Sequence, residues 1–374
     1  MADHDVIVIG AGAMGSAALY HLSRRGLRVL GLERFEPGHD RGSSHGLTRI
    51  IRLGYFEDPA YVPLLHRTYT LWRELETASC QQLLHVTGIA EMGPPDGELV
   101  RGTLRSAEQH GLPHEVVAAD ALQQRLPALR LPDHYIAVLQ PDGGYLEAEP
   151  AIHAHVALAR EAGAELRANV TVHAVEPHGR GVQVLTDAGS FRARAAIVAA
   201  GPWLKKLMPD CAPLRVARQM MAWFAPKEPT LFTPDRFPVF LLESRHGIHY
   251  GFPLLGEAGV KIAKHYHRDE TVDPDAQARS VTVADEDVIR AAIADHLPAA
   301  NGPLVAAKSC LYTMTPDGHF ILDRLPHCPA IIIASPCSGH GFKFAPVIGE
   351  ILADLVETGT TRHDISRFRL GRFG

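Results

Sequence analysis

Short apolar runs alternate with helical patterns at both ends of this 374-residue chain. Near the N-terminus, residues 5–9 predict a buried strand, residues 16–25 a helix and residues 28–32 a second strand. Near the C-terminus, a predicted strand at 330–335 precedes a helix at about 344–357. Strands that alternate with helices are typical of a parallel sheet covered by helices. Both ends of the chain therefore have the pattern of an α/β sheet.

The middle of the chain has two further patterns. Helices are predicted at 58–76 and 148–163, and strand patterns follow the second helix at 165–175 and 181–186. Residues 212–311 are rich in strand-like segments and prolines. This composition indicates a separate region dominated by β-structure.

Composition and charge exclude several classes of protein. The hydrophobic fraction is 46%, the charged fraction is 21% and the formal net charge is −5, without a long basic run, so we expect no nucleic-acid partner. No apolar run approaches the ~20 residues of a membrane-spanning helix. The chain enters a predicted strand almost at once, which leaves no room for a signal peptide, so the expected compartment is the cytoplasm. Five cysteines without a CxxC pair do not indicate a disulfide scaffold, and the 22 histidines are scattered without metal-ligand spacing, so no metal is expected.

A glycine-rich turn joins the first predicted strand to the first helix. Gly10 permits the tight turn, Gly12 lets the backbone approach a pyrophosphate, and Gly15 lets the helix and strand pack closely. The helix N-terminus favours an anion, and Glu33, after the second strand, can accept hydrogen bonds from a ribose hydroxyl. This complete βαβ unit predicts binding of an ADP-ribose group; the alternative is a chance glycine-rich turn.

A second apolar strand, predicted from residue 195, ends at Gly201. Ligands of α/β sheets lie outside the carboxyl ends of the strands, so a glycine there indicates a backbone that lies close to a cofactor. The alternative is an ordinary core strand followed by a turn.

Residues 42–57 concentrate polar and cationic side chains directly after the βαβ unit. The residues concerned are Ser43, Ser44, His45, Thr48, Arg49 and Arg52. Arginines at such a place can bind a carboxylate in bidentate fashion or stabilise an anionic ring. The alternative is a solvated basic helix face, although the interleaved Ile50 and Ile51 argue against a wholly exposed segment.

Three later segments carry further candidate residues. Lys261 and His265 lie four positions apart and would point to one face of a strand; the alternative is a half-exposed edge strand. Cys310 is either a reactive group or a buried structural thiol. Lys343 ends the polar loop 339–343 and would either pair with a carboxylate or cap a surface loop.

Together these segments resemble the family of monomeric sarcosine oxidases and N-methyltryptophan oxidases. The resemblance runs from the first strand to Phe373. Its most specific motifs are Gly42-Ser-Ser-His-Gly-x-Thr-Arg-Ile-Ile-Arg52, the run Lys-Ser-Cys310-x-Tyr312-Thr, and Ser338-Gly-His-Gly-Phe-Lys343-Phe. Three such motifs in the right order are far less expected by chance than one glycine-rich turn.

The resemblance implies that FAD is the cofactor and that a thioether joins its flavin 8α-methyl group to Cys310. Arg52 and Lys343 match the cations that hold the substrate carboxylate. Tyr250 and Glu57 match positions in or beside the same pocket.

The resemblance also implies the catalytic groups. Tyr312 matches a tyrosine of the pocket, His265 a histidine beside the substrate amine, and Lys261 the oxygen-activating lysine that faces flavin N5. Arg49, with His45 and Thr48, matches residues packed against the flavin, and its positive charge would stabilise an anion. The residues expected to contact the cofactor are Gly10, Gly12, Gly15, Glu33, Ser43, His45, Thr48, Gly201, Cys310, Gly339 and Gly341.

The chain departs from the family pattern at two places. Leu47 stands where the family often has an aspartate, which removes an acidic group from the flavin-side segment. Cys337 is a second thiol in flavin-adjacent sequence, so it is the other candidate for the covalent link. The ending 368–373 is more similar to the N-methyltryptophan oxidase branch.

The implied fold is α/β, with a glutathione-reductase-like FAD-binding Rossmann domain and an interleaved antiparallel-sheet substrate domain. Residues 1–80, 148–210 and 312–374 are expected to form the FAD-binding domain. Residues 81–147 and 211–311 are expected to form the substrate domain, with approximate boundaries.

The implied reaction is oxidation of a small N-methyl amino acid by O₂, giving the primary amino acid, formaldehyde and hydrogen peroxide, with the chain acting as a monomer. Alternative substrates within this class are N-methyl-L-tryptophan, glycine and a cyclic imino acid such as pipecolate. Two other classes are a flavin dehydrogenase that passes electrons to a carrier, and a flavin-binding protein without catalytic activity.

Overall fold

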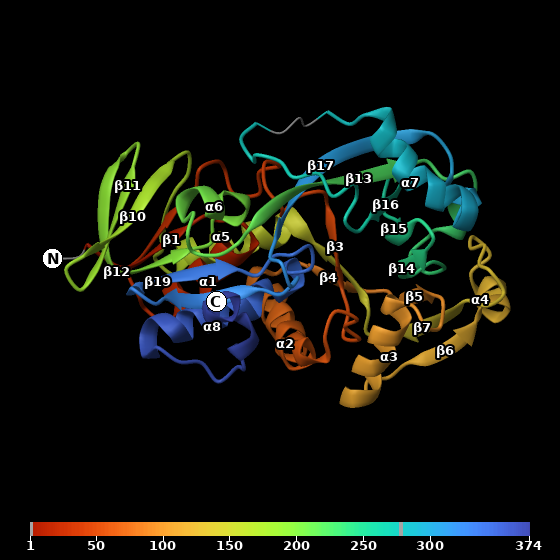
Figure 1. The fold of residues 1–374 in the computed structure, drawn as a ribbon, viewed down its shortest axis with the longest axis horizontal. Helices are drawn as coiled ribbons and strands as arrows, with labels where there is room; N and C mark the ends of the chain where they lie inside the picture. Colours follow the sequence, from red (N-terminus) through yellow and green to blue (C-terminus); the bar gives the residue numbers. More distant parts are fainter. Residues whose placement is uncertain (1–2, 277–279) are drawn as a thin grey trace.

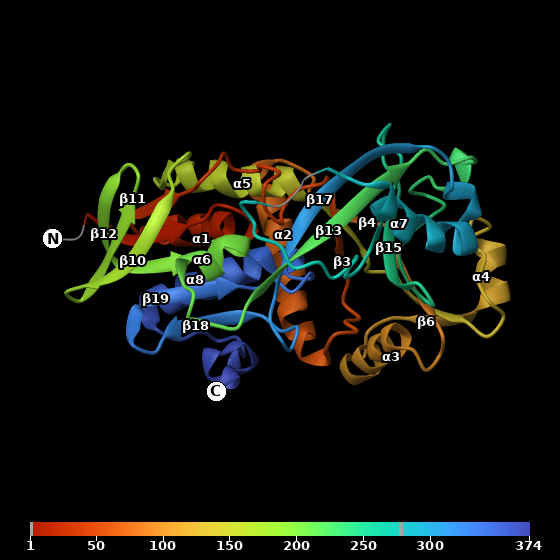
Figure 2. The same cartoon turned by 45° about the horizontal axis from the view of Figure 1, so that its top comes forward.

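The computed structural model describes residues 3–276 and 280–374, and it places the two larger sheets in neighbouring regions of an elongated molecule (Figure 1). The N-terminus lies at the far end of the first region. Long strands of the second sheet extend toward the first region (Figure 2). The fold is therefore mixed α/β, as expected.

The first sheet is built on five parallel strands. In spatial order they are β9 (Glu165–Arg167), β2 (Val29–Leu32), β1 (His4–Ile9), β12 (Gly189–Val198) and β19 (Cys328–Ser335). Antiparallel strands extend it: β18 (Ile321–Leu325) on β19, and the hairpin of β10 (Val172–His178) and β11 (Gly181–Thr186) on the first half of β12.

Both faces of this sheet are covered, which explains the unbroken apolar run of β1. Val6 and Val8 face a core that includes α1 (Ala13–Arg24), whereas Ile7 and Ile9 join a second cluster with Val182 and Val184 of β11. Side chains alternate between the faces of a strand, so a strand buried on both sides needs apolar residues at every position.

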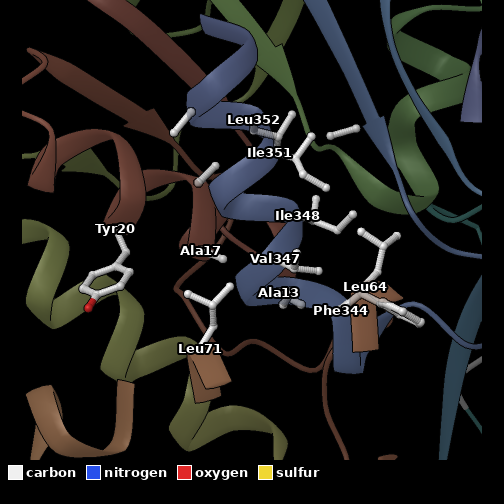
Figure 3. Close-up of a cluster of buried hydrophobic side chains, with 14 of the residues drawn as sticks. Ala13, Ala17, Tyr20, Leu64, Leu71, Phe344, Val347, Ile348, Ile351 and Leu352 are labelled. Carbon is white, nitrogen blue, oxygen red and sulfur yellow. The ribbon is translucent and has the colours of Figure 1, made fainter. Parts of the chain in front are cut away.

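Helix α1 packs between α5 (Ala148–Glu161) and α8 (Ala345–Thr358), and α2 (Val62–Ser79) contacts both of these helices. Figure 3 shows apolar side chains of α1, α2 and α8 gathered in one cluster, among them Ala17, Leu64, Leu71 and Ile348. This layer fixes the position of the helix N-terminus that follows the glycine-rich turn.

The second sheet has eight strands, and all of its pairs are antiparallel except that of β14 with β5. In spatial order they are β17 (Leu304–Met314), β13 (Arg215–Phe224), β16 (Val260–Lys264), β15 (Gly247–Leu254), β14 (Val239–Ser244), β5 (Ile89–Gly93), β7 (Ile136–Gln140) and β6 (Glu115–Ala118). The helices of this region are α3 (Glu98–His110), α4 (Ala119–Arg125) and α7 (Val283–His296).

A third, three-stranded sheet joins β3 (Thr48–Ile51), β8 (Gly144–Glu147) and β4 (Leu84–Val86). The strands of the second sheet fall within 81–147 and 211–311, except for the last residues of β17. The third sheet mixes segments from both expected domains. The division into domains therefore stays a prediction.

Several expected elements have different bounds in the structure. The predicted strand at 165–175 is two strands, β9 and β10. The helix expected at 58–76 begins as the 3₁₀ turn Pro59–Tyr61 and continues as α2 to Ser79. The apolar strand before Gly201 ends at Val198, and Gly201–Trp203 forms a 3₁₀ turn that leads into α6 (Leu204–Leu207). In the described ranges, none of the helices is both long and apolar enough to cross a bilayer.

Candidate active site

One cavity of about 440 Å³ is lined by residues from both large sheets. Gly10 follows β1, Glu33 follows β2 and Gly201 lies just beyond β12, so these residues stand at the carboxyl ends of parallel strands. The second sheet contributes Leu241 of β14, Tyr250 of β15, and Cys310 and Tyr312 of β17. The nucleotide part of the cavity is the part lined by Gly10, Gly12 and Glu33. The charged part is the part lined by Arg52, Glu57, His265 and Lys343.

The three glycines of the first turn are needed for different reasons. Gly10 has a φ of +90°, and a Cβ there would lie 2.6 Å from the carbonyl oxygen of Ala199. A Cβ on Gly15 would lie 1.7 Å from the carbonyl oxygen of Gly10. A Cβ on Gly12 would come no closer to protein than 3.7 Å, from Ser44 Oγ. Gly10 and Gly15 are thus demanded by the chain itself, whereas Gly12 keeps open space that borders the cavity.

Glu33 is held by the backbone of the nucleotide part. Its Oε2 accepts a hydrogen bond from the Ala11 N–H at 2.6 Å, and its Oε1 accepts one from the Phe35 N–H at 2.9 Å. A carboxylate offers about four acceptor positions, so two remain for hydroxyl donors.

Asp275 closes the same part of the cavity from the segment that follows β16. Its carboxylate accepts hydrogen bonds from Arg34 Nη1 at 2.6 Å, Trp203 Nε1 at 2.7 Å and Lys206 Nζ at 2.7 Å. All four residues line the cavity. A segment of the second region is therefore tied to the nucleotide part.

The segment after the βαβ unit is folded around its own arginine. Arg49 Nη2 donates to the carbonyl oxygens of Ser43 at 2.7 Å and His45 at 2.6 Å, and Nη1 donates to that of Thr48 at 2.8 Å. The segment is not a solvated helix face, because Thr48–Ile51 is strand β3 and Arg49 lines the cavity. Burial, reinforced by the charge of Arg49, lowers the pKa of His45 to about 3, so its imidazole is neutral.

Lys261 is fully buried and its ammonium group is occupied. Its Nζ donates to the carbonyl oxygens of Gly46 at 2.7 Å and Thr48 at 2.9 Å, and to Thr48 Oγ1 at 3.2 Å. Burial lowers its pKa well below the usual value. Strand β16 lies between β13 and β15, so the edge-strand alternative is wrong. The strand ends at Lys264, one residue before His265.

Cys310 is buried and borders the cavity, so its burial alone does not make it a purely structural thiol. Burial raises its pKa, and the positive charges of Arg49 and Lys261 act in the opposite direction. Cys337 also borders the cavity, and burial raises its pKa too.

Arg52 is the centre of a buried charged cluster. Its Nη2 donates to Glu57 Oε2 at 2.7 Å, and its Nη1 donates to the carbonyl oxygen of Gly54 at 2.7 Å. The guanidinium carbon lies 4.4 Å from the centre of the Tyr55 ring and 4.7 Å from that of Phe56. Burial alone would lower the pKa of Arg52, but Glu57, Glu91 and Tyr55 together outweigh it, and the pKa is raised.

Lys343 is buried in the same cluster, so it does not cap a surface loop. Its Nζ donates to the carbonyl oxygen of His340 at 2.8 Å and to the Tyr55 hydroxyl at 3.4 Å. Burial and the charge of Arg52 lower its pKa to about 7. His340 Nε2 donates to the carbonyl oxygen of Gly318 at 2.9 Å, so Nδ1 accepts from the Tyr55 hydroxyl at 2.7 Å.

His265 and Tyr312 face each other where the two regions meet. The Tyr312 hydroxyl lies 3.4 Å from His265 Nδ1, and a Cβ on Gly339 would lie within 3 Å of both side chains. Burial lowers the pKa of His265 to about 3, so the imidazole is neutral and can accept a hydrogen bond. A glycine at 339 is therefore required by these two rings.

Most of the residues expected at the site line this one cavity. They are Gly10, Gly12, Glu33, Ser43, Arg49, Arg52, Gly201, Tyr250, His265, Cys310, Tyr312, Gly339, Gly341 and Lys343. Gly15, His45, Thr48 and Lys261 are buried but do not line it. The roles assigned to all of these residues, in the cavity wall or behind it, stay predictions.

Two polar groups that lie behind the charged part were not predicted from the sequence. Glu91 of β5 is fully buried, and its Oε1 lies 3.5 Å from Arg52 Nη1. Gln140 of β7 accepts a hydrogen bond from the Gly54 N–H at 2.9 Å. The available signal was a single acid inside an apolar strand, because a glutamate is rarely buried without a partner.

The residues of the nucleotide part and of the neighbouring segment 43–48 have the properties that FAD binding requires. Gly12 keeps open a space that a Cβ would enter, and Glu33 has acceptor positions left over. Ser43 lines the cavity, and its buried Oγ has no hydrogen-bond partner among the described residues. Buried polar groups usually have a partner, which a bound group would supply here.

Comparisons with known proteins agree with this geometry. The family model for FAD-dependent oxidoreductases matches residues 5–355. The monomeric sarcosine oxidase of Streptomyces avermitilis is 42% identical over 98% of this chain and 96% of its own length. The N-methyl-L-tryptophan oxidase of Salmonella dublin is 38% identical over 99% of both chains.

Solved structures give the same fold. The open form of NikD, an unusual amino acid oxidase essential for nikkomycin biosynthesis, has a TM-score of 0.87 and is 28% identical, with 99% of this chain and 98% of that chain covered. The chain therefore belongs to the FAD-dependent oxidoreductase family, in the group that contains the monomeric sarcosine oxidases and the N-methyl-L-tryptophan oxidases.

Proposed function

We propose that this protein is an FAD-dependent oxidase that converts a small N-methyl amino acid and O₂ to the primary amino acid, formaldehyde and hydrogen peroxide. The observation that carries this proposal is the pair of buried cations, Arg52 and Lys343, in the cavity that the glycine-rich βαβ turn also lines. The identity of 42% to a monomeric sarcosine oxidase supports the same substrate class.

Arg52 and Lys343 would bind the substrate carboxylate. They come from segments nearly 300 positions apart, and both are almost fully buried. The guanidinium group has five N–H donors, of which two donate to Glu57 and Gly54. A desolvated cation pair of this kind fixes the orientation of a ligand as well as its affinity.

His265 would accept a hydrogen bond from the substrate amine. Its imidazole is neutral because burial lowers its pKa to about 3, so it favours the neutral amine over the ammonium form. The Tyr312 hydroxyl, 3.4 Å away, orients the ring. When bound, FAD supplies the two-electron oxidation of the amine and the transfer of both electrons to O₂.

Cys310 would hold the flavin covalently through a thioether. Its sulfur is buried at the cavity wall; burial raises the pKa of its thiol, and the charges of Arg49 and Lys261 oppose that rise. The positive charges of Arg49 and Lys261 would also stabilise negative charge that develops during the oxygen reaction. Tyr250, which also lines the cavity, would close the substrate pocket.

The proposed oligomeric state and the proposed cellular compartment rest on the same family. The relative named a monomeric oxidase supports a single chain as the working unit. We infer the cytoplasm as its compartment. Sedimentation of the purified protein and fractionation of the producing cell test these two inferences.

The decisive experiment follows flavin absorbance without oxygen. Sarcosine should bleach the flavin, and admission of O₂ should restore the colour and release hydrogen peroxide. N-Methylpropylamine, which has a secondary amine but no carboxylate, is the matched control and should bleach it far more slowly. Faster bleaching by N-methyl-L-tryptophan or pipecolate than by sarcosine would show that the preferred substrate is another secondary amino acid. Reoxidation by a dye but not by O₂ would indicate a dehydrogenase, and no bleaching by any secondary amino acid would overturn the proposal.

A further inference from the structure

Glu91 is a buried carboxyl group directly behind the proposed carboxylate site. It lies in the middle of β5, where its paired neighbours are Leu241 of β14 and Val138 of β7. Its exposed fraction is 0%, and the nearest cation atom is Arg52 Nη1 at 3.5 Å. An ionised carboxylate at such a place is costly unless a cation compensates it.

Glu91 shares that cation with a better-placed carboxylate. Glu57 Oε2 accepts from Arg52 Nη2 at 2.7 Å, whereas Glu91 Oε1 is 3.5 Å from Nη1, and Nη1 already donates to Gly54. When two carboxylates share a site, one ionises readily and the other resists ionisation. The pKa of Glu57 falls to about 2; burial and the Glu57 charge raise that of Glu91 to about 7.

The charges of the cluster balance without a ligand. When Lys343 is protonated, it and Arg52 supply two positive charges, and Glu57 and an ionised Glu91 supply two negative charges. A bound carboxylate makes three negative charges against two positive ones in a buried site. Protonation of Glu91 restores the balance, because Glu57 is held ionised by its short hydrogen bond to Arg52.

We propose that Glu91 is the charge-balancing group of this site, ionised opposite Arg52 when no ligand is bound and protonated by one proton from solvent when a carboxylate binds between Arg52 and Lys343. The proposal rests on the proposed function, which supplies that carboxylate ligand. Glu91 would thus act through Arg52 and would not touch the substrate. Its consequence is an affinity for anionic ligands that falls as the pH rises.

The charged and polar side chains that act on Glu91 come from three segments. Arg52 and Glu57 come from the segment after β3, Lys343 from the 3₁₀ turn before α8, and Thr103 from α3; β14 and β7 present the apolar Leu241 and Val138. Lys343 is the one neighbour that also titrates near neutral pH, since its pKa is lowered to about 7. Anion binding would favour its protonated form too, so the test must separate the two groups.

The test uses the flavin-containing enzyme and (methylthio)acetate, a carboxylate without an amine, so that only protein groups titrate. Calorimetric titrations at pH 8 in two buffers of different ionisation enthalpy give the number of protons taken up per ligand. Glu91→Gln should take up about one proton fewer than the wild type. The same variant should bind the ligand about tenfold more tightly at pH 8, the factor that one pH unit above a pKa near 7 imposes.

Two further variants keep the outcome unambiguous. Lys343→Arg, which keeps the positive charge but does not titrate near neutral pH, should still take up the proton of Glu91, and Thr103→Ser, which keeps the hydroxyl group beside Glu91, should leave proton uptake unchanged. Equal uptake in Glu91→Gln and the wild type would overturn the proposal. So would weaker binding by Glu91→Gln at every pH, because that result describes a group that only positions Arg52.

The proposal can still be tested if the Glu91→Gln variant does not fold. If Glu91→Gln yields no protein, the absence of proton uptake in Lys343→Arg would overturn the proposal by itself. If the wild type does not bind (methylthio)acetate, the proposed carboxylate recognition fails and the role of Glu91 fails with it. Binding with an unaltered proton count in Glu91→Gln would remove only the role of Glu91.

Discussion

The nucleotide part and the charged part of the cavity are built in opposite ways. The nucleotide part uses backbone groups, two glycines and the carboxylate of Glu33, all within the first 33 residues. The charged part uses ionisable side chains from the segment after β3, the residue after β16 and the loop before α8, with Glu91 of β5 buried behind them. Residues that are close in the sequence form the nucleotide part, whereas the charged part forms only when distant segments pack together.

The difference has an energetic consequence. A backbone cradle needs no charge of its own, because N–H groups and the helix N-terminus already favour an anion. Buried side-chain charges must be neutralised by one another before a ligand arrives, so a change at one of them alters its neighbours. Substitutions should therefore have local effects in the nucleotide part and coupled effects in the charged part.

The largest expected effect concerns the link between the two parts. Cys310→Ser should release all of the flavin when the protein is precipitated with acid, because no thioether can form, whereas the wild-type pellet should stay yellow. Cys337→Ser is the matched control and should retain the flavin. Flavin retained by Cys310→Ser would place the link elsewhere, with Cys337 as the first candidate.

Removing a cation of the charged part should have the next largest effect. Arg52→Ala leaves Glu57 and Glu91 without their shared partner, and truncation of a desolvated charged contact costs about 2–5 kcal/mol. The dissociation constant of (methylthio)acetate, followed by flavin absorbance, should rise correspondingly, and Lys343→Ala should behave similarly. Unchanged inhibitor binding would remove the residue from carboxylate recognition.

Lys261 tests whether the segment between the two parts serves the oxygen reaction. Loss of a preorganised cation slows the step it serves roughly 10²–10³-fold, so Lys261→Met should slow reoxidation by O₂ more than anaerobic reduction by substrate. Lys264→Met, at the end of the same strand, should change neither rate. Lys261 also donates hydrogen bonds to the carbonyl oxygens of Gly46 and Thr48. Equal losses in both half-reactions would therefore show that Lys261 positions the flavin-side segment instead.

The smallest of these effects separates two glycines of the nucleotide part. Gly15→Ala should lower the free energy of unfolding by about 1–3 kcal/mol, since its Cβ meets the Gly10 carbonyl at 1.7 Å. Gly12→Ala has no such contact, so it should leave the stability of flavin-free protein unchanged and lower only the flavin content. Denaturant unfolding and flavin absorbance per chain measure the two quantities. Equal stability of the two variants would contradict the distinction.

The sequence predicted the nucleotide part well because its determinants are local. The strand, turn, helix and Glu33 follow one another within one βαβ unit, and each stands in the structure close to its expected place. The fold class and the family were equally accessible, since motifs along the whole chain point to them. The exact ends of elements were less so: His265 lies just beyond β16, where the ladder still continues through its N–H to Ile248.

The charged part could be predicted only through resemblance, and then incompletely. Arg52 and Lys343 stand in recognisable motifs, but no pattern joins Tyr55 to His340 or Glu91 to Arg52, because folding alone brings these segments together. Lys261 shows the same limit of prediction from sequence. Its expected position opposite the flavin could be written from the motif, whereas its three hydrogen bonds to Gly46 and Thr48 appear only in three dimensions.

Asp275 has a consequence for the timing of cofactor loading. Because a segment that leaves the second sheet fastens onto Arg34, Trp203 and Lys206, the cofactor must enter before this latch closes or after it has reopened. The carboxylate is 37% exposed, and ion pairs at that exposure contribute only about 0–1 kcal/mol each, so the latch opens often. The bond proposed between Cys310 and the flavin would then decide how long a flavin stays in the protein, and the latch would decide only how quickly a new one enters.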